Sequence, residues 1–146
     1  MRLNLSTDYA LRVMLFVGAR SEGLSQIAEI AAAYDISHNH LMKVVNRLVQ
    51  LGYLESVRGR HGGMKLARKA EKIFAGEIVR DFEPDLRPLD CGSCIMAKGC
   101  QLTCLLQKAV AAFLAQLDAT SIADILEREK QSGGPHVGHR APLFER

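Results

Sequence analysis

Hydrophobic residues recur three and four positions apart in the first fifty residues, which is the spacing of an α-helix with one buried face. This pattern predicts three helices, over residues 5–20, 26–34 and 37–50. Ser and Thr side chains can accept hydrogen bonds from the free N–H groups at a helix start. We therefore expect the three starts to be capped by Ser6 or Thr7, by Ser25 and by Ser37.

The third predicted helix has two contrasting faces. Its apolar stripe consists of Leu41, Val44, Val45 and Leu48. The opposite face carries Asn39, Lys43, Asn46, Arg47 and Gln50. That face has amide and basic groups but no carboxylate, whereas an ordinary solvated face would mix in acidic residues. Amides pair with adenine, and Arg and Lys with guanine or phosphate, so the face indicates DNA reading by Asn39, Lys43, Asn46 and Arg47.

A β-hairpin is predicted directly after this helix. Residues 53–57 and 64–67 have strand-like patterns, and Arg58-Gly59-Arg60-His61-Gly62-Gly63 between them forms a flexible basic tip. Two short helices, a reading helix and such a hairpin make a winged helix-turn-helix domain over residues 1–69. We expect Arg58, Arg60, His61 and Gly62 of the wing to contact the DNA backbone or a minor groove. A nucleotide-binding loop is the alternative, but neither phosphate-binding glycine fingerprint is present.

The second half of the chain is predicted to be helical around one irregular loop. Residues 70–100 hold a connecting helix (76–83) and a cysteine-rich loop, residues 101–128 a long helix (101–118) and a capped final turn, and residues 129–146 a disordered tail. The fold class is therefore mainly α with a small β-hairpin. The long helix has an apolar stripe that a single winged-helix domain cannot bury, so it is expected to pair in a homodimer suited to a palindromic operator. Packing within the same chain is the alternative.

Composition and charge predict where the protein is located and what it binds. The 146 residues are 48% hydrophobic and 24% charged, which is ordinary for a globular protein. No apolar run approaches the roughly 18 residues that a membrane span needs, and we expect a cytoplasmic protein with no membrane partner. Residues 1–69 hold ten Lys and Arg against five Asp and Glu, a net charge of +5, while residues 70–146 hold nine against eleven, a net charge of −2. The basic half is thus expected to meet double-stranded DNA.

The cysteines are confined to one segment with the pattern Cys-x2-Cys-x5-Cys-x3-Cys, formed by Cys91, Cys94, Cys100 and Cys104. In a cytosolic chain such a cluster indicates a metal site more than a disulfide framework. Thiolates bind zinc or iron–sulfur clusters. Structural zinc usually takes two Cys-x2-Cys pairs, so the longer gap favours a cluster. A thiol redox switch, with Lys98 lowering a thiolate pKa, and inert cysteines remain as alternatives.

Several motifs together resemble a known family. These are Met1-Arg2-Leu3 with Thr7-Asp8-Tyr9-Ala10-Leu11-Arg12, the helix segment Leu41–Leu48, Gly52-Tyr53-Leu54, and the wing residues 58–63. They resemble the iron–sulfur winged-helix regulators that include the IscR, RirA and NsrR types, and the similarity extends from Met1 to about Leu126. Within this family the chain is most similar to the NsrR-type nitric-oxide-sensing repressors.

This resemblance implies a [4Fe-4S] cluster, held by three loop cysteines and by an aspartate from the first helix of the other subunit. The matching residues are Cys91, Cys94, Cys100 and Asp8. An acid at a helix start is also favourable without any metal. Cys91 and Cys94 are closer in sequence than the family pattern, and Cys104, one helical turn beyond Cys100, competes for the fourth position. A [2Fe-2S] cluster and zinc are the alternatives, and Thr103 stands where IscR types carry a histidine ligand.

The resemblance also implies a function. We expect a homodimeric repressor that releases its operator when nitric oxide attacks the cluster. A regulator of the same fold that responds to iron or cluster status is one alternative, and a zinc or thiol redox module with incidental DNA contact is another. An enzyme is not expected, because His38, His40 and His61 all lie on predicted DNA-facing elements and no nucleophile–base arrangement is evident.

Overall fold

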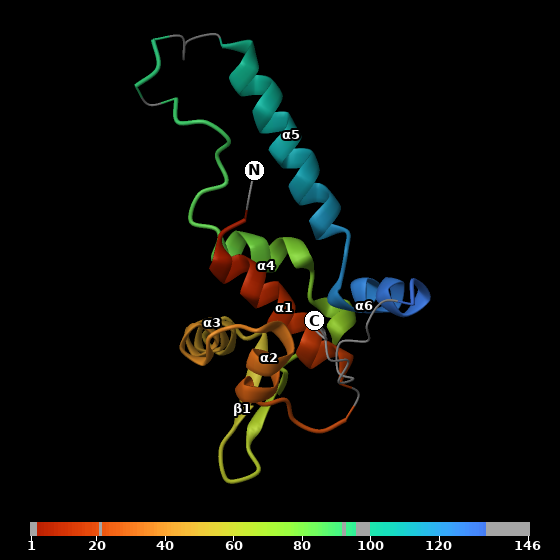
Figure 1. Ribbon diagram of the computed structural model, residues 1–146. Coiled ribbons are helices and arrows are strands. Elements are labelled where there is room, and N and C mark those ends of the chain that lie inside the picture. Colours follow the sequence, from red (N-terminus) through yellow and green to blue (C-terminus); the bar gives the residue numbers. More distant parts are fainter. Residues whose placement is uncertain (1–2, 21, 92, 96–99, 134–146) are drawn as a thin grey trace, which may run out of the picture.

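The computed structural model describes residues 3–20, 22–91, 93–95 and 100–133. Its elements, in chain order, are α1 (Leu5–Ala19), α2 (Ile27–Tyr34), α3 (His38–Gln50), β1 (Leu54–Val57), β2 (Gly63–Leu66), the short 3-10 helix η1 (Ala70–Lys72), α4 (Ala75–Phe82), α5 (Gln101–Asp118) and α6 (Ile122–Gln131) (Figure 1). The predicted class, mainly α with one two-stranded hairpin, is confirmed. Among the described helices, none is both long and apolar enough to cross a membrane.

Helix α1 is the centre of the hydrophobic core. It packs against α3, α4, α6 and β2. Its side chains at Ala10, Val13 and Met14 are fully buried, at the helical spacing that the sequence predicts. Each neighbouring helix contributes its own apolar face to the same core. The winged-helix domain and helix α6 therefore share one core, with α1 between them (Figure 1).

Two helix starts differ from the sequence prediction. The cap of α1 is Asn4, whose side-chain oxygen accepts a hydrogen bond from the Thr7 N–H at 2.9 Å. Helix α2 starts after Gln26, whose N–H donates to Glu29 Oε2 at 2.7 Å. Ser25 is buried instead, because its backbone pairs with Met64 in an antiparallel bridge. Ser37 occupies its predicted N-cap position at the start of α3, but its side chain makes no capping hydrogen bond.

The hairpin forms the predicted wing with slightly shifted strands. β1 and β2 are antiparallel, with Leu54 opposite Leu66 and Val57 opposite Gly63. At the base of the wing, the Ser25 N–H donates to the Met64 carbonyl at 2.9 Å, and the Met64 N–H returns a bond of 2.8 Å. The bridge anchors the wing to the segment before α2, so the wing projects from the body as a fixed element (Figure 1).

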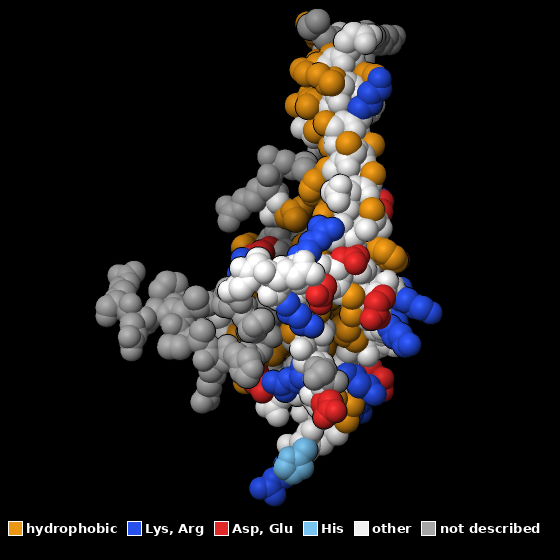
Figure 2. Space-filling model, turned by 90° about the vertical axis from the view of Figure 1, so that its right-hand side faces the viewer, with side chains coloured by type: hydrophobic (Ala, Val, Ile, Leu, Met, Phe, Trp, Pro, Cys, Tyr) orange, Lys and Arg blue, Asp and Glu red, His pale blue; other side chains and the backbone are white. Residues whose placement is uncertain are grey.

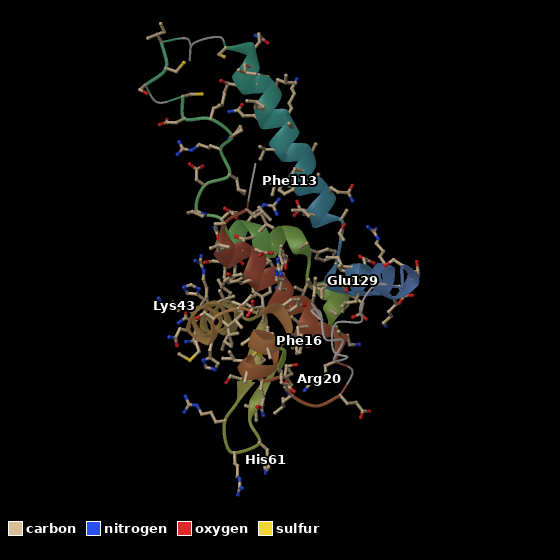
Figure 3. All side chains as sticks on the ribbon, viewed as in Figure 1. Phe16, Arg20, Lys43, His61, Phe113 and Glu129 are labelled. Atoms are coloured by element: carbon tan, nitrogen blue, oxygen red, sulfur yellow. The ribbon has the colours of Figure 1, made fainter. Side chains whose placement is uncertain are left out.

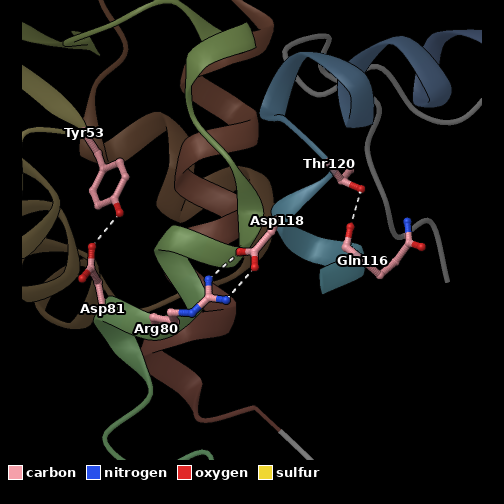
Figure 4. Close-up of polar contacts among 6 residues, drawn as sticks. All are labelled: Tyr53, Arg80, Asp81, Gln116, Asp118 and Thr120. Atoms are coloured by element: carbon pink, nitrogen blue, oxygen red, sulfur yellow. Dashed lines mark hydrogen bonds and ion pairs between the residues drawn. The ribbon is translucent and has the colours of Figure 1, made fainter. Parts of the chain in front are cut away.

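Helices α4, α5 and α6 meet at a junction of backbone hydrogen bonds. The Ala75 N–H donates to the Thr120 carbonyl at 3.0 Å, and the Ile122 N–H to the Ile73 carbonyl at 2.9 Å. Arg80 on α4 binds both carboxylate oxygens of Asp118 on α5, at 2.5 and 2.6 Å (Figure 4). These contacts fix the end of α5 against the body.

Helix α6 corrects one predicted boundary. It begins with the predicted capping box, in which the Asp124 N–H donates to Ser121 Oγ and the Ser121 N–H to Asp124 Oδ2. The sequence predicted that this helix ends at residue 128 and that a disordered tail starts at residue 129. Both predictions are wrong for residues 129–131, because α6 continues to Gln131. The Gln131 side chain donates to Glu127 at 3.2 Å, which supports this extra turn. Ser132 and Gly133 follow as a turn, and residues 134–146 of the expected tail lie outside the described residues.

Helix α5 projects from the body; within this chain none of its side chains is fully buried, although Leu106, Val110 and Phe113 are half-buried. Leu102 and Leu105 are 54% and 63% exposed. Figure 2 shows hydrophobic side chains along the projecting helix. An 18-residue helix with such a surface is unusual for a monomer, because exposed apolar area of this kind normally marks an interaction site.

The wing base yields a stability prediction. A Cβ on Gly63 would lie 2.7 Å from the Ser25 carbonyl oxygen and 2.9 Å from Leu24 Cβ. Since the carbonyl oxygen belongs to a paired backbone, Gly63→Ala is expected to lower the free energy of unfolding by about 1–3 kcal/mol. Urea denaturation measures this. Ser56→Ala, on the exposed side of the paired strand, is the control and should change it by less than about 0.5 kcal/mol; equal values for both variants would contradict the close contact.

Candidate nucleic-acid interface and cysteine loop

The outer face of α3 is exposed as the sequence predicts. Leu41, Val44, Val45 and Leu48 are buried against the core, which turns the other face outward. Asn39, Lys43 and Asn46 are all exposed on it, and Figure 3 shows Lys43 on the outer side of the helix. These side chains are therefore free to meet a DNA groove, although the contact itself stays a prediction.

Arg47 lies differently from its predicted companions. Its guanidinium sits 4.8 Å from the centre of the Phe82 ring and donates a hydrogen bond to the carbonyl of Asp81. Both partners belong to the end of α4. The side chain is thus directed toward the body of the protein, although its residue remains solvent-exposed.

The wing tip presents its basic residues to solvent. Arg58, Arg60 and His61 are exposed, and His61 lies at the far end of the wing in Figure 3. Gly62 has a structural role as well, because its N–H donates to the Gly59 carbonyl at 2.9 Å. A Cβ on Gly62 would lie 2.3 Å from the Val57 carbonyl oxygen, so this turn admits only glycine.

A groove joins the reading helix to the wing. It is lined by α3 and by the hairpin, and it also takes in the start of α2. His38, which the sequence already placed on a DNA-facing element, lines it together with Asn46 and Arg58, and so does Gln26, which the sequence did not single out. The pattern of α3 could not have revealed Gln26, because the groove depends on how the hairpin folds back. The groove has a mixed polar and apolar lining, and Asn46 and Arg58 within it could contact a nucleic-acid backbone.

The described cysteines differ in their surroundings. Cys91 is half-buried, with its Sγ 3.4 Å from the Thr103 hydroxyl oxygen. Cys100 is also half-buried and is the residue at which α5 begins. Cys94 and Cys104 are exposed. Thr103 therefore lies beside two thiols, a role that its place one turn into the long helix could have suggested.

The start of α5 favours the thiolate form of Cys100. The nearby backbone and side chain of Thr103, and then the Leu102 backbone, stabilise the thiolate and lower the pKa of the Cys100 thiol below its usual value. A thiolate at a helix start is a soft, anionic ligand, which suits an iron–sulfur cluster or zinc. Lys98, which the sequence offered as another cause of a low thiolate pKa, lies outside the described residues.

Asp8 is paired with a cation on its own helix. It lies in the first turn of α1, where its Oδ1 accepts a hydrogen bond from Arg12 Nε at 2.9 Å, and its side chain is 40% exposed. Among the described residues, no three His, Cys, Asp or Glu side chains gather closely enough to hold a metal ion. The expected set of Cys91, Cys94, Cys100 and Asp8 thus stays a prediction.

Comparisons with known proteins agree on one kind of molecule. The Rrf2 family model, described as an iron-dependent transcriptional regulator, matches residues 3–128. The HTH-type transcriptional regulator NsrR of Geobacillus kaustophilus is 44% identical over 133 residues, which cover 87% of this chain and 90% of that protein. NsrR of Bacillus subtilis is 43% identical over 136 residues, covering 89% and 93%. The structure of CymR, the global cysteine regulator of B. subtilis, is 24% identical with a TM-score of 0.77, covering 88% and 98% of the two chains.

The surroundings of Cys100 yield a prediction about reactivity. In metal-free protein, Cys100 should react with iodoacetamide with a pH midpoint below that of an ordinary cysteine, because the thiolate is the reacting form. Mass spectrometry of the alkylated peptide measures the midpoint. Thr103→Val removes the hydroxyl and should raise it, whereas Thr103→Ser should leave it low. An ordinary midpoint in the unmodified sequence would refute the effect.

Proposed function

The chain belongs to the Rrf2 family of iron-dependent transcriptional regulators, and we propose that it is a homodimeric repressor that senses nitric oxide through a [4Fe-4S] cluster. It is a DNA-binding transcriptional regulator with a winged helix-turn-helix fold and not an enzyme. The observation that carries the finer proposal is the 44% identity to an NsrR over 87% of the chain, in a sequence that keeps an acidic residue at position 8 and three loop cysteines.

The cysteine loop supplies the ligands in this proposal. Cys91, Cys94 and Cys100 hold the cluster, and the bonds of Thr103 and Leu102 keep Cys100 ready as a thiolate. A bound cluster supplies iron, which is the atom with which nitric oxide reacts. Cys104 is exposed one helical turn beyond Cys100 and is the competing fourth ligand.

Asp8 is the proposed fourth ligand, reaching the loop of the other subunit. Its exposure at the start of α1 leaves it accessible to a partner chain. Arg12 gives this carboxylate an alternative partner on its own helix. Asp8 therefore has two states, bound across the dimer or paired with Arg12, and the second is available whenever the first is lost.

The projecting helix supports the homodimer. Helix α5 leaves Leu102 and Leu105 largely exposed and only half-buries its other leucines, and a second copy of the same helix would cover them. A two-fold dimer places two α3 helices on one side of the molecule. Such dimers read palindromic operators whose half-sites lie about one turn of DNA apart.

Operator binding uses the exposed face of α3 and the wing. Asn39 and Asn46 supply amides for base edges, and Lys43 supplies charge for a phosphate or a guanine. Arg58 and Arg60 extend the contact along the backbone or into a minor groove.

One specific observation favours a second candidate signal. The family is described as iron-dependent, which suits sensing of iron or cluster status on the same fold.

The visible absorption spectrum tests the proposed cofactor and signal. Protein purified without oxygen should be brown, with a broad thiolate-to-iron band that falls in proportion to added nitric oxide. A band that is present but insensitive to nitric oxide would favour the iron-status candidate. A colourless protein that stays colourless after reconstitution with iron and sulfide would contradict the cluster.

Ligand variants test the proposed ligand set. Cys91→Ala, Cys94→Ala and Cys100→Ala should abolish the visible band, because each removes a thiolate ligand. Asp8→Ala should lower the bound iron content, and Cys104→Ala, its matched control, should leave it unchanged. Iron and sulfide analysis measures both. The reverse result for Asp8 and Cys104 would assign Cys104 as the fourth ligand and remove the proposed tie between subunits.

A wing variant tests the proposed contact with the DNA backbone. Arg60→Ala should weaken binding to an operator duplex selected from a random pool, and should reduce the slope of log K against log salt by about 0.9 for each lost phosphate contact. Lys130→Ala on α6, which removes a charge far from the wing, is the control and should keep the slope. Equal slopes for wild type and Arg60→Ala would exclude a phosphate contact by this residue.

A further inference from the structure

Three consecutive residues at the end of α4, Asp81, Phe82 and Glu83, bind three other elements; we call them the 81–83 junction. Asp81 contributes two contacts on the side of the DNA-facing elements. Its backbone carbonyl accepts a hydrogen bond from the Arg47 guanidinium of α3. Its carboxylate Oδ2 accepts a bond of 2.6 Å from the hydroxyl of Tyr53, which directly precedes β1 (Figure 4).

Phe82 and Glu83 connect the same junction to the start of α1. The Phe82 ring lies under the Arg47 guanidinium, at 4.8 Å, and its carbonyl accepts a bond of 2.9 Å from the Asn4 side chain. Glu83 Oε1 accepts a bond of 2.8 Å from the Asn4 N–H. Asn4 is also the cap of α1. The junction thus holds the start of α1, the reading helix and the hairpin together.

The two segments proposed to carry cluster ligands both leave from this junction. The cysteine loop follows Glu83, and Asp8 lies one helical turn after Asn4. A displacement of either segment would therefore act on Phe82 and Glu83. On its other side, the 81–83 junction is linked to α3. Among the contacts described above, this link is made by the side chain of Arg47.

Arg47 differs from its neighbours on the outer face of α3 by its side-chain contacts. Its spacing of four from Lys43 and three from Gln50 places it on the same face, where it is exposed. Its guanidinium already has a ring and a carbonyl as partners. To reach a phosphate it would have to give up both.

We infer that Arg47 is a positioning residue, which couples the orientation of α3 to the 81–83 junction instead of contacting DNA. Through this residue the state of the cysteine loop and of the α1 start sets the angle at which α3 meets the operator. The coupling part of this inference rests on the proposed function, while the positioning part does not.

The salt dependence of operator binding tests the positioning part. Full-length, cluster-loaded Arg47→Met and Lys43→Met are compared with wild type on the same selected operator. Both variants remove one charge and keep a long apolar stem. Lys43→Met should reduce the slope of log K against log salt by about 0.9, as expected for one lost phosphate contact, whereas Arg47→Met should keep the wild-type slope. A slope reduction in Arg47→Met equal to that in Lys43→Met would overturn the inference.

The ratio of operator Kd values in the cluster-free and cluster-loaded states tests the coupling part. Arg47→Met should lower this ratio at least threefold relative to wild type, and Lys43→Met should weaken both states and keep the ratio. Arg47→Lys is a second, milder variant and should also lower the ratio. It keeps the charge, but a lysine cannot both stack on the Phe82 ring and bond to the Asp81 carbonyl as arginine does. An unchanged ratio in both Arg47 variants would overturn the coupling. A wild-type ratio of one would instead overturn the proposed function, and the salt slope would still decide the role of Arg47.

Discussion

The arrangement of this protein depends on the hydrogen bonds of the Asn4 side chain. This side chain caps α1 through the Thr7 N–H and at the same time donates to the Phe82 carbonyl at the end of α4. One residue thereby fixes the start of the central helix and the exit toward the cysteine loop. Because α1 packs on α3, α4, α6 and β2, an error in its placement would reach every part of the core. The charged and polar groups of the DNA-facing surface are held by that same core.

The molecule separates a rigid reading surface from an exposed assembly surface. The wing and α3 are anchored by backbone pairing and by buried apolar residues, which suits a surface that must match a DNA groove. Helix α5 is joined to the body at its end, by Arg80 and Asp118, and leaves Leu102 and Leu105 near its start largely exposed. The ligand cysteines of the proposed cluster lie at that start, the end of α5 that points away from the body (Figure 1), so cluster chemistry would act first on the assembly surface.

Local patterns predicted most of the fold, because the helices are amphipathic and the hairpin is marked by its glycines. They failed where a tertiary contact decides. Asn4 caps α1 because the end of α4, 78 positions away in sequence, holds it there. Ser25 is drawn into a bridge with Met64 and so cannot cap α2. The contacts of the Arg47 side chain with Phe82 and Asp81 were likewise not predictable from spacing, because both partners come from another helix. The cysteine ligand set depends on the path of a long loop and on a second chain, which no spacing rule contains.

The central claim is that cluster chemistry controls the affinity of this chain for DNA. The most direct test is the operator Kd of the cluster-loaded protein, measured without oxygen at one fixed salt concentration, before and after addition of nitric oxide. The account predicts that the Kd rises about tenfold or more as the visible band falls, in the range of typical coupling free energies. An operator Kd that stays constant while the band disappears would contradict it.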